Sequence, residues 1–243
     1  MSDVKNSSLA TDLVSYWELE EASGTRVDSH GSNDLADVNT VASATGIQGE
    51  GADFVPSNSE RLSRNSVSDL YTSGNWSTSL WFKPGTASAG QCLISYSDSG
   101  DSATFLHLFI LSSKLYVRRQ FASGSLQWVD VTGSTTLSNG TWYHIVVTFD
   151  TTDRMRIYLN SSQDGFNSNT TGNPVSLTRK FDIGMRNRPA DFFTDGVIDE
   201  VGWWHKALST SEISDLYNSG AGIPYDAGGG GVVNPALLGL GRI

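Results

Sequence analysis

A short row of side chains near the middle of the chain has the composition of a sugar-binding surface. In the alternating segment from Lys114 to Phe121, Tyr116, Arg118 and Gln120 fall on one side, and Leu115 and Val117 fall on the other. Aromatic rings stack on the C–H faces of pyranoses, while guanidinium and amide groups bond to their hydroxyls. We therefore expect this row to bind a glycan, together with three tryptophans from other segments. These tryptophans are Trp81, Trp128 and Trp204.

A second group of residues offers hard oxygen ligands. Asp28, Asn33 and Asp34 lie close together in the turn that follows the first predicted strand. Calcium binds six to eight oxygens from carboxylates, amide carbonyls and the backbone, and such a turn supplies them. The alternative is an Asx turn with solvated acids. The turn thus predicts either one structural calcium ion or a plain turn without metal.

Paired acids that could hydrolyse a glycosidic bond are scarce. A glycosidase needs two carboxylates about 5 to 10 Å apart, which in a strand requires acids at alternate positions on one face. Glu18 and Glu20 could share a face, but they stand where the first predicted strand gives way to a loop. Asp199 and Glu200 are adjacent. The histidines are scattered and no nucleophile elbow is present, so we expect no enzymatic activity, and a glycoside hydrolase is the least favoured function.

Strands must position most of these side chains. The chain contains 25 Gly and seven Trp but only 17% charged residues, a composition typical of short strands joined by polar turns. Alternating or β-branched segments suit two packed antiparallel sheets. The predicted strands are Leu13–Leu19, Ala52–Val55, Arg61–Arg64, Trp76–Lys83, Cys92–Tyr96, Thr104–Leu111, Lys114–Phe121, Leu126–Val131, Tyr143–Phe149, Arg154–Leu159, Arg179–Ile183 and Val197–Trp204.

One helix is predicted near the C-terminus. Ser209 can cap its first turn while Glu212 reaches back to the amide of the cap, and apolar residues then follow at helical spacing. The preceding run, Val197 to Trp204, is β-branched and aromatic, as in a largely buried strand. Because neighbouring residues of a strand point to opposite faces, we expect one of Trp203 and Trp204 to be less buried.

The segment from Gly196 to Gly220 resembles the closing signature of laminin G-like jelly rolls in the concanavalin A-like lectin and glucanase superfamily. Leu13 to Thr25 is similar to the opening strand of this family, and Asn75 to Pro84 and Thr141 to Asp150 resemble its central strands. The resemblance implies an all-β, two-sheet antiparallel jelly-roll sandwich with one short C-terminal helix. It also implies that Asp199 joins a calcium ion bound at the Asp28 turn.

The resemblance covers residues 11–226 and leaves two ends. Residues 1–10 are small and polar, and we expect them to form an arm. Residues 227–243 comprise a Gly-rich linker and an apolar tail. We expect so apolar a tail on an acidic protein to dock on a neighbouring copy or on a different protein. Its apolar residues include Val232, Val233, Leu237, Leu238, Leu240 and Ile243.

The net charge of −10 argues against two classes of partner. Nucleic acids and anionic membrane surfaces are bound by clustered Lys and Arg, so we expect neither. The single cysteine, Cys92, lies in an apolar strand and is expected to be a buried thiol. Neither a membrane-spanning run nor a signal peptide is visible, which predicts synthesis in a cytoplasm.

These observations predict a non-catalytic, lectin-like display or adhesion module whose ligand is a glycan, such as a host-surface polysaccharide. A cytoplasmically made module with its own docking tail resembles the laminin G-like domains of bacteriophage fibres and capsid decorations. That resemblance implies a homo-oligomer on a virion surface. The alternative is a purely structural virion or surface subunit without a glycan ligand.

Overall fold

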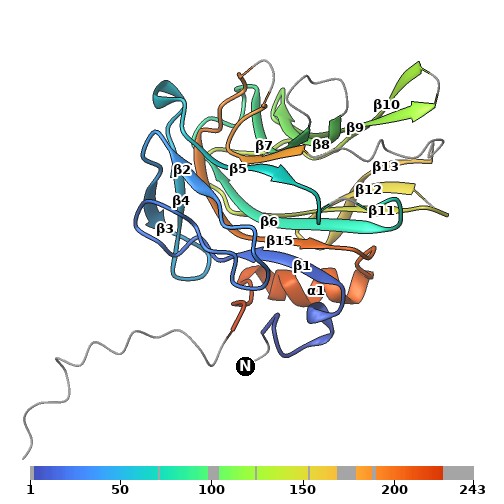
Figure 1. Cartoon of the computed structure of the whole chain (residues 1–243), viewed down its shortest axis with the longest axis horizontal. Coiled ribbons are helices and arrows are strands. Elements are labelled where there is room, and N and C mark those ends of the chain that lie inside the picture. The colour runs from blue at the N-terminus through green and yellow to red at the C-terminus, as the bar shows by residue number, and fades with distance from the viewer. Residues whose placement is uncertain are drawn as a thin grey trace, which may run out of the picture.

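Two antiparallel sheets pack face to face in the computed structural model of this chain (Figure 1). The structure describes residues 3–70, 72–97, 104–123, 125–152, 154–168, 179–187 and 190–226, with the side chains of residues 104, 105, 120–123 and 125–128 outside that description. The predicted all-β jelly-roll sandwich is therefore confirmed.

The first sheet has eight strands. Its order is β13 (Ser162–Asn167), β12 (Arg154–Leu159), β11 (Tyr143–Asp150), β6 (Trp76–Pro84), β15 (Gly196–Trp204), β4 (Glu50–Phe54) and β3 (Ala42–Thr45), and β1 (Leu13–Trp17) also pairs with β15. The second sheet has seven strands. Its order is β10 (Ser125–Thr132), β9 (Lys114–Ser123), β8 (Thr104–Leu111), β7 (Gln91–Ser97), β14 (Arg179–Ile183), β5 (Arg61–Val67) and β2 (Ala36–Val38).

Each of the twelve predicted strands is present, and the structure adds three that the sequence did not reveal. The additional strands β2, β3 and β13 all lie at the edges of their sheets. None of them has a buried residue, so none carries the apolar alternation that marks a half-buried strand. The described residues also form three short 3-10 segments: η1 (Ser8–Ala10), η2 (Pro56–Asn58) and η3 (Asn218–Gly220).

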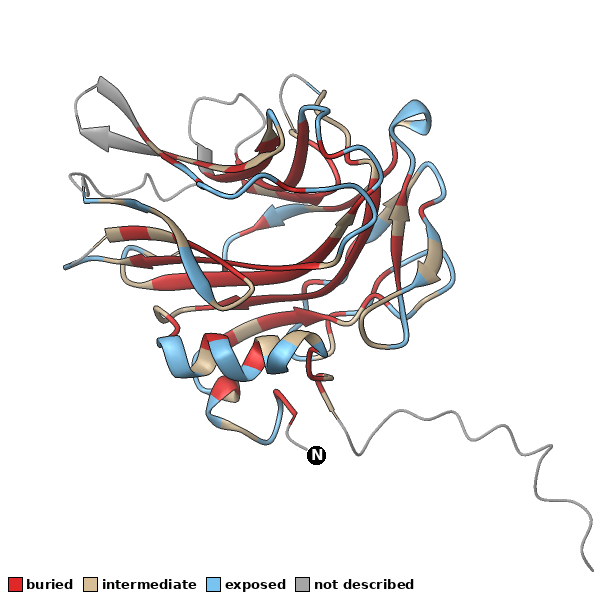
Figure 2. Ribbon diagram, turned by 180° about the vertical axis from the view of Figure 1, so that it is seen from behind, coloured by how far each residue is buried: buried red, intermediate tan, exposed pale blue. Residues whose placement is uncertain are grey.

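The main core fills the space between the sheets, where both sets of strands are buried (Figure 2). Strand alternation directs Trp76, Leu80 and Phe82 of β6 into this core. Trp76 stacks on Trp203 with ring centroids 5.5 Å apart, and the indole N–H of Trp203 donates to the carbonyl of Leu70 at 3.0 Å. The buried indoles are thus packed and, for Trp203, hydrogen-bonded, as buried tryptophans usually are.

A second, smaller core seals part of the outer face of the eight-stranded sheet. Helix α1 (Thr210–Tyr217) and the N-terminal arm lie beside β1 there (Figure 1). The backbone of the arm pairs with the segment after the helix, with Val4 donating to Pro224 at 3.1 Å and Lys5 to Tyr225 at 2.9 Å. This core contains Val4, Leu9, Leu13, Tyr16, Val146, Tyr158, Trp204, Leu208, Ile213, Leu216, Ile223 and Tyr225.

The capping box predicted for the helix is confirmed. The Ser209 hydroxyl accepts from the Glu212 amide at 3.3 Å, and the Glu212 carboxylate accepts from the Ser209 amide at 2.9 Å. The prediction that Trp203 or Trp204 is less buried is wrong, because both are fully buried. Trp203 points into the main core and Trp204 into the second core, so both faces of the strand are covered at this point. Cys92 is a buried thiol, as predicted.

In the described part of the chain, no helix is both long and apolar enough to cross a membrane.

Replacing a buried residue of α1 tests whether the second core stabilises the domain. Ile213 is fully buried, so Ile213→Ala should lower the free energy of unfolding by about 2 to 5 kcal/mol. Its neighbour Ser214 is exposed, and Ser214→Ala should change the value by less than about 0.5 kcal/mol. Urea denaturation followed by tryptophan fluorescence measures both. Equal values for the two variants would show that the helix is not an integral layer of the fold.

Candidate functional site

Strand β9, which carries Tyr116 and Arg118, lies on the side of the molecule opposite α1 (Figure 1). Both side chains belong to the outer face of the seven-stranded sheet. Strand alternation puts them there, because the intervening Leu115 and Val117 belong to the main core. The structure therefore brings two of the six predicted sugar-binding residues together.

Asp130 of the neighbouring strand β10 joins these two residues. The Arg118 guanidinium donates two hydrogen bonds to the Asp130 carboxylate, from Nε to Oδ1 at 3.0 Å and from Nη2 to Oδ2 at 2.9 Å. The Tyr116 hydroxyl donates to the same carboxylate and accepts from Arg118 Nη2 at 2.7 Å. Arg118 and Asp130 remain 37% and 35% exposed. The group is rigid and internally neutralised, yet a solute can reach it.

Aromatic rings extend this group towards the loop between β14 and β15. The Phe109 ring lies 6.2 Å from Tyr116 and 5.6 Å from Phe192, which is part of that loop. A second bidentate pair stands beside Phe192, where Arg186 binds Asp191 at 2.6 and 2.7 Å. We call Phe109, Tyr116, Arg118, Asp130, Arg186, Asp191 and Phe192 the outer-face cluster.

The loop that carries Phe192 is fixed to the sheet. The Phe192 carbonyl accepts from the Cys92 amide at 2.7 Å, and the Thr194 hydroxyl donates to the Cys92 carbonyl at 2.9 Å. Arg186 also lies over the Phe192 ring, 4.7 Å from its centroid. The cluster is therefore an aromatic row flanked by two Arg–Asp pairs and supported by backbone hydrogen bonds.

Burial sets the protonation of two residues at this face. Desolvation and the bond to Asp130 raise the pKa of Tyr116 to about 12, so its hydroxyl stays a donor. His107 faces Arg118 across the strands. Burial, together with the charges of Arg186 and Arg118, lowers the pKa of His107 to about 3. His107 is thus a neutral ring beneath the cluster.

Two further predicted residues cannot be placed in the cluster by their side chains. Gln120 and Trp128 are directly opposite each other in the β9–β10 pairing. Their side chains lie outside the described residues.

The prediction that Trp81 and Trp204 contact a ligand is wrong. Trp81 is only 3% exposed, because α1 covers it, and its ring stacks on Tyr217 at 5.8 Å. Trp204 is fully buried in the second core, where its indole donates to the carbonyl of Leu9 at 2.6 Å. The helix and the arm, which sequence alternation does not locate, occupy the face that these rings would otherwise offer.

The Asp28 turn is held by hydrogen bonds that leave little room for a cation. Asp28 Oδ1 accepts from the amides of Tyr16, His30 and Gly31 at 2.8 to 3.1 Å, and Oδ2 accepts from Asn33 at 2.9 Å. Asp34 accepts from the Asp28 amide at 2.9 Å. N–H groups aimed at these oxygens compete with a positive ion. The turn fits the predicted Asx alternative better than the predicted calcium site.

Asp199 serves a different turn. Its carboxylate accepts from the amides of Ile47 and Gln48 at 2.8 and 3.1 Å, and burial raises its pKa to about 7. Over the described residues, no three His, Cys, Asp or Glu side chains gather as ligands of one metal. Calcium binding stays a prediction, and the four predicted ligands do not form one cation site here.

The acids considered for catalysis are used within the fold. Glu200 is 3% exposed and accepts from the Tyr16 hydroxyl at 2.5 Å. Glu18 accepts from the Ser29 hydroxyl at 2.6 Å, and Glu20 accepts from the Glu50 amide at 3.0 Å. These bonds join β1 to β15, and join the segment after β1 to Ser29 and to the start of β4.

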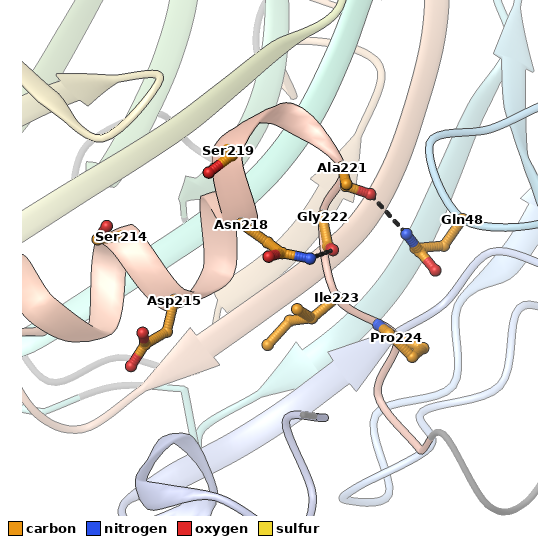
Figure 3. Close-up of a pocket in the computed structure, with 9 residues that line it drawn as sticks. All are labelled: Gln48, Ser214, Asp215, Asn218, Ser219, Ala221, Gly222, Ile223 and Pro224. Carbon is orange, nitrogen blue, oxygen red and sulfur yellow. Dashed lines mark hydrogen bonds between the residues drawn. The ribbon is translucent and has the colours of Figure 1, made fainter. Parts of the chain in front are cut away.

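A cavity of about 500 Å³ lies where the chain leaves α1 (Figure 3). The side-chain amides at its edge already bind the backbone, since Gln48 donates to the Ala221 carbonyl at 2.6 Å and Asn218 to the Gly222 carbonyl at 2.8 Å. The Gln48 bond ties the turn between β3 and β4 to the segment that follows the helix, and the Asn218 bond closes that segment on itself. We therefore assign this cavity a structural role.

One protein family matches the chain. The profile of a laminin G-like family, described as the concanavalin A-like lectin/glucanases superfamily, matches residues 57–214, which is more than half of the chain. A search of curated protein sequences finds no match.

Solved structures share the fold at low sequence identity. Domain 4 of AbnA, a GH43 extracellular arabinanase from Geobacillus stearothermophilus in complex with arabinotriose, is 18% identical with a TM-score of 0.63, over 84% of this chain and 97% of that one. The botulinum neurotoxin serotype D binding domain is 16% identical with a TM-score of 0.67, over 86% and 52%. The chain thus spans about half the length of this toxin domain.

A third structure comes from work on botulinum neurotoxin type C, whose cell entry is described as dependent on interaction with two ganglioside molecules. It is 14% identical with a TM-score of 0.64, over 86% of this chain and 51% of that one. At these identities the three likenesses show the fold.

The buried imidazole of His107 predicts a specific dependence of stability on pH. Its folded pKa of about 3 lies below the ordinary value of 6.5. An unfolded chain therefore takes up the proton first, and stability is lost as pH falls from 6.5 towards 3. Between pH 7 and pH 5 the free energy of unfolding should fall by roughly 2 kcal/mol more for the wild type than for His107→Gln.

Urea denaturation at each pH measures this difference. The other histidines titrate equally in both proteins and cancel in the comparison. Parallel pH profiles for the two proteins would show that His107 is solvated or protonated in the folded state.

Proposed function

The chain belongs to the concanavalin A-like lectin/glucanase superfamily, and we propose that it is a non-catalytic, lectin-like module that binds a glycan through the outer-face cluster. The glycan would lie against the partly exposed rings of Tyr116 and Phe192, with the buried ring of Phe109 packed between them and the Arg118–Asp130 and Arg186–Asp191 pairs bonding to its hydroxyls.

One observation carries this proposal. The outer-face cluster combines ring surfaces with fixed donors and acceptors on a sheet face that α1 and the arm leave uncovered. Pyranose rings need such a combination, because their C–H faces stack on aromatic rings and their hydroxyls both donate and accept. Each arginine is neutralised by its own aspartate, so the cluster suits polar hydroxyls without demanding a charged ligand.

The comparisons support the proposal at the level of the fold. The arabinanase domain was solved in complex with arabinotriose, and cell entry of the type C toxin is described as dependent on gangliosides. Arabinotriose is a saccharide and gangliosides contain saccharides, but these are the ligands of the arabinanase domain and of the toxin. A shared fold makes a saccharide ligand plausible for this chain, while the site must be argued from its own residues.

A non-catalytic role is favoured by the state of the acids. Glu18, Glu20 and Glu200 each accept a hydrogen bond within the fold. In the outer-face cluster, Asp130 and Asp191 are each held by an arginine. A glycosidase must instead present two carboxyl groups to the substrate, on either side of the glycosidic bond.

We extend the proposal to the role of a display subunit on a virion surface, as a capsid decoration or fibre component made in the cytoplasm. The support is compositional: a Gly-rich linker leads to the apolar residues of the tail, from Val232 to Ile243, all outside the described residues. In this proposal the tail docks on a neighbouring copy of the chain and forms a homo-oligomer.

A glycan array followed by calorimetry tests the binding face. The wild type should bind at least one array glycan saturably, and Tyr116→Ala should weaken that binding by at least about tenfold because a stacked aromatic ring is lost. Tyr116→Phe keeps the ring and should retain most of the affinity. Ser214→Ala, on the exposed side of α1, serves as the control. If no array glycan binds, the chain is better explained as a purely structural subunit.

A truncation after Asp226 tests the tail. The full chain should sediment as an oligomer and residues 1–226 as a monomer, because the apolar contact surface is removed. The unfolding midpoint should stay the same, since both cores lie within the described residues before the linker. Identical sedimentation of the two proteins in analytical ultracentrifugation would contradict docking of the tail on a second copy.

A further inference from the structure

A second cavity, of about 450 Å³, lies at the rim of the sandwich and takes no part in the outer-face cluster. Strands β4, β6 and β15 contribute to it, together with the loops that follow β6, precede β11 and precede β15. We call it the rim pocket. Its lining residues are Asp53, Lys83, Pro84, Gly85, Asn139, Gly140, Asp195, Gly196 and Val197.

The sheet register builds the floor and two walls of the rim pocket. Val197 of β15 pairs with Asp53 of β4 on one side and with Lys83 of β6 on the other. All three alternate with core residues, so they stand on the outer face. Two strand spacings of about 4.8 Å separate Asp53 from Lys83. A carboxylate and an ammonium group thus flank an apolar floor across a gap of about 10 Å.

The loops add polar groups above this floor. Asp195 comes from the loop before β15, and the Asn139 side chain is held by its Oδ1, which accepts from the Ala87 amide at 2.8 Å. Asn139 also lines the pocket. A Cβ on Gly85 would stand 2.6 Å from Asp195 Oδ1. Glycine at this position therefore leaves room for the carboxylate.

The charged groups of the rim pocket keep their bonding capacity. Among the described residues, the side chains of Asp53, Lys83 and Asp195 form no hydrogen bond or ion pair, although all three are only partly exposed. The Lys83 ammonium lies 5.0 Å from the centre of the Trp142 ring, which is itself partly exposed. Polar groups held within one cavity beside an aromatic ring, but not satisfied by the protein, point to an external ligand.

We propose that the rim pocket is a second binding site, for a single uncharged sugar unit. Asp53 and Asp195 would accept from its hydroxyls, Lys83 and the Asn139 amide would donate to them, and Val197 and Pro84 would contact its C–H groups. A volume of about 450 Å³ falls in the usual range of small-molecule sites. An acidic sugar is disfavoured, because two carboxylates face one ammonium in a chain of net charge −10.

The inference is tested by two-dimensional amide NMR of the full chain during titration with the methyl glycosides of glucose, galactose and mannose. At least one of them should shift the amides of Gly85, Gly140 and Gly196 and the side-chain amide of Asn139. Asp195→Asn keeps the shape but removes the charge, and should weaken this binding by roughly 10- to 100-fold. Lys83→Gln should weaken it as well, and Ser214→Ala should leave it unchanged. Glucuronate should not bind.

The same spectra separate this inference from the glycan-binding face proposed above. Shifts limited to β9 and β10 would support the outer-face cluster and overturn the rim pocket. Absence of shifts at the rim with all three neutral glycosides, or shifts that survive in both Asp195→Asn and Lys83→Gln, would also overturn it.

Discussion

A two-layer sandwich has four sheet faces, and each must be packed against protein or carry groups that tolerate water. Two faces form the main core, where Trp76, Trp203 and their neighbours are buried. Part of the third face is closed by α1 and the arm, which form the second core around Trp204. The outer face of β8, β9 and β10 is left to loops and solvent. Because the two sheets are covered unequally, a binding surface can form on the outer face of the seven-stranded sheet.

Paired charges, rather than deep burial, distinguish the open face. Tyr116, Arg118 and Asp130 come from adjacent strands, and the fixed spacing of those strands sets their mutual geometry. The loop before β15 contributes a second Arg–Asp pair and Phe192, and it is anchored to β7 through the backbone of Cys92. Rigid strands and an anchored loop therefore arrange the cluster before any ligand arrives, which reduces the entropic cost of binding.

Much of this fold could be predicted from the sequence, because local patterns encode it. The strand from Arg154 to Leu159 was predicted with its observed bounds, and the Ser209–Glu212 capping box marked the start of α1. Edge strands such as β13, with its polar Ser162–Asn167 sequence, carry no such pattern. Only a smaller part of the site could be predicted. Strand alternation in the sequence predicts that Tyr116 and Arg118 lie on an outer face. It cannot predict that α1 and the arm cover Trp81 and Trp204, or that Phe192 approaches Phe109, because these are tertiary contacts between distant segments.

The most direct test of the open-face account is a crystal structure of the domain with an oligosaccharide selected on a glycan array. The account predicts density for a sugar ring against Tyr116 or Phe192, with hydroxyls bonded to Arg118, Asp130, Arg186 or Asp191. An oligosaccharide bound only over α1 and β1, with the outer face of β8 to β10 empty, would contradict it.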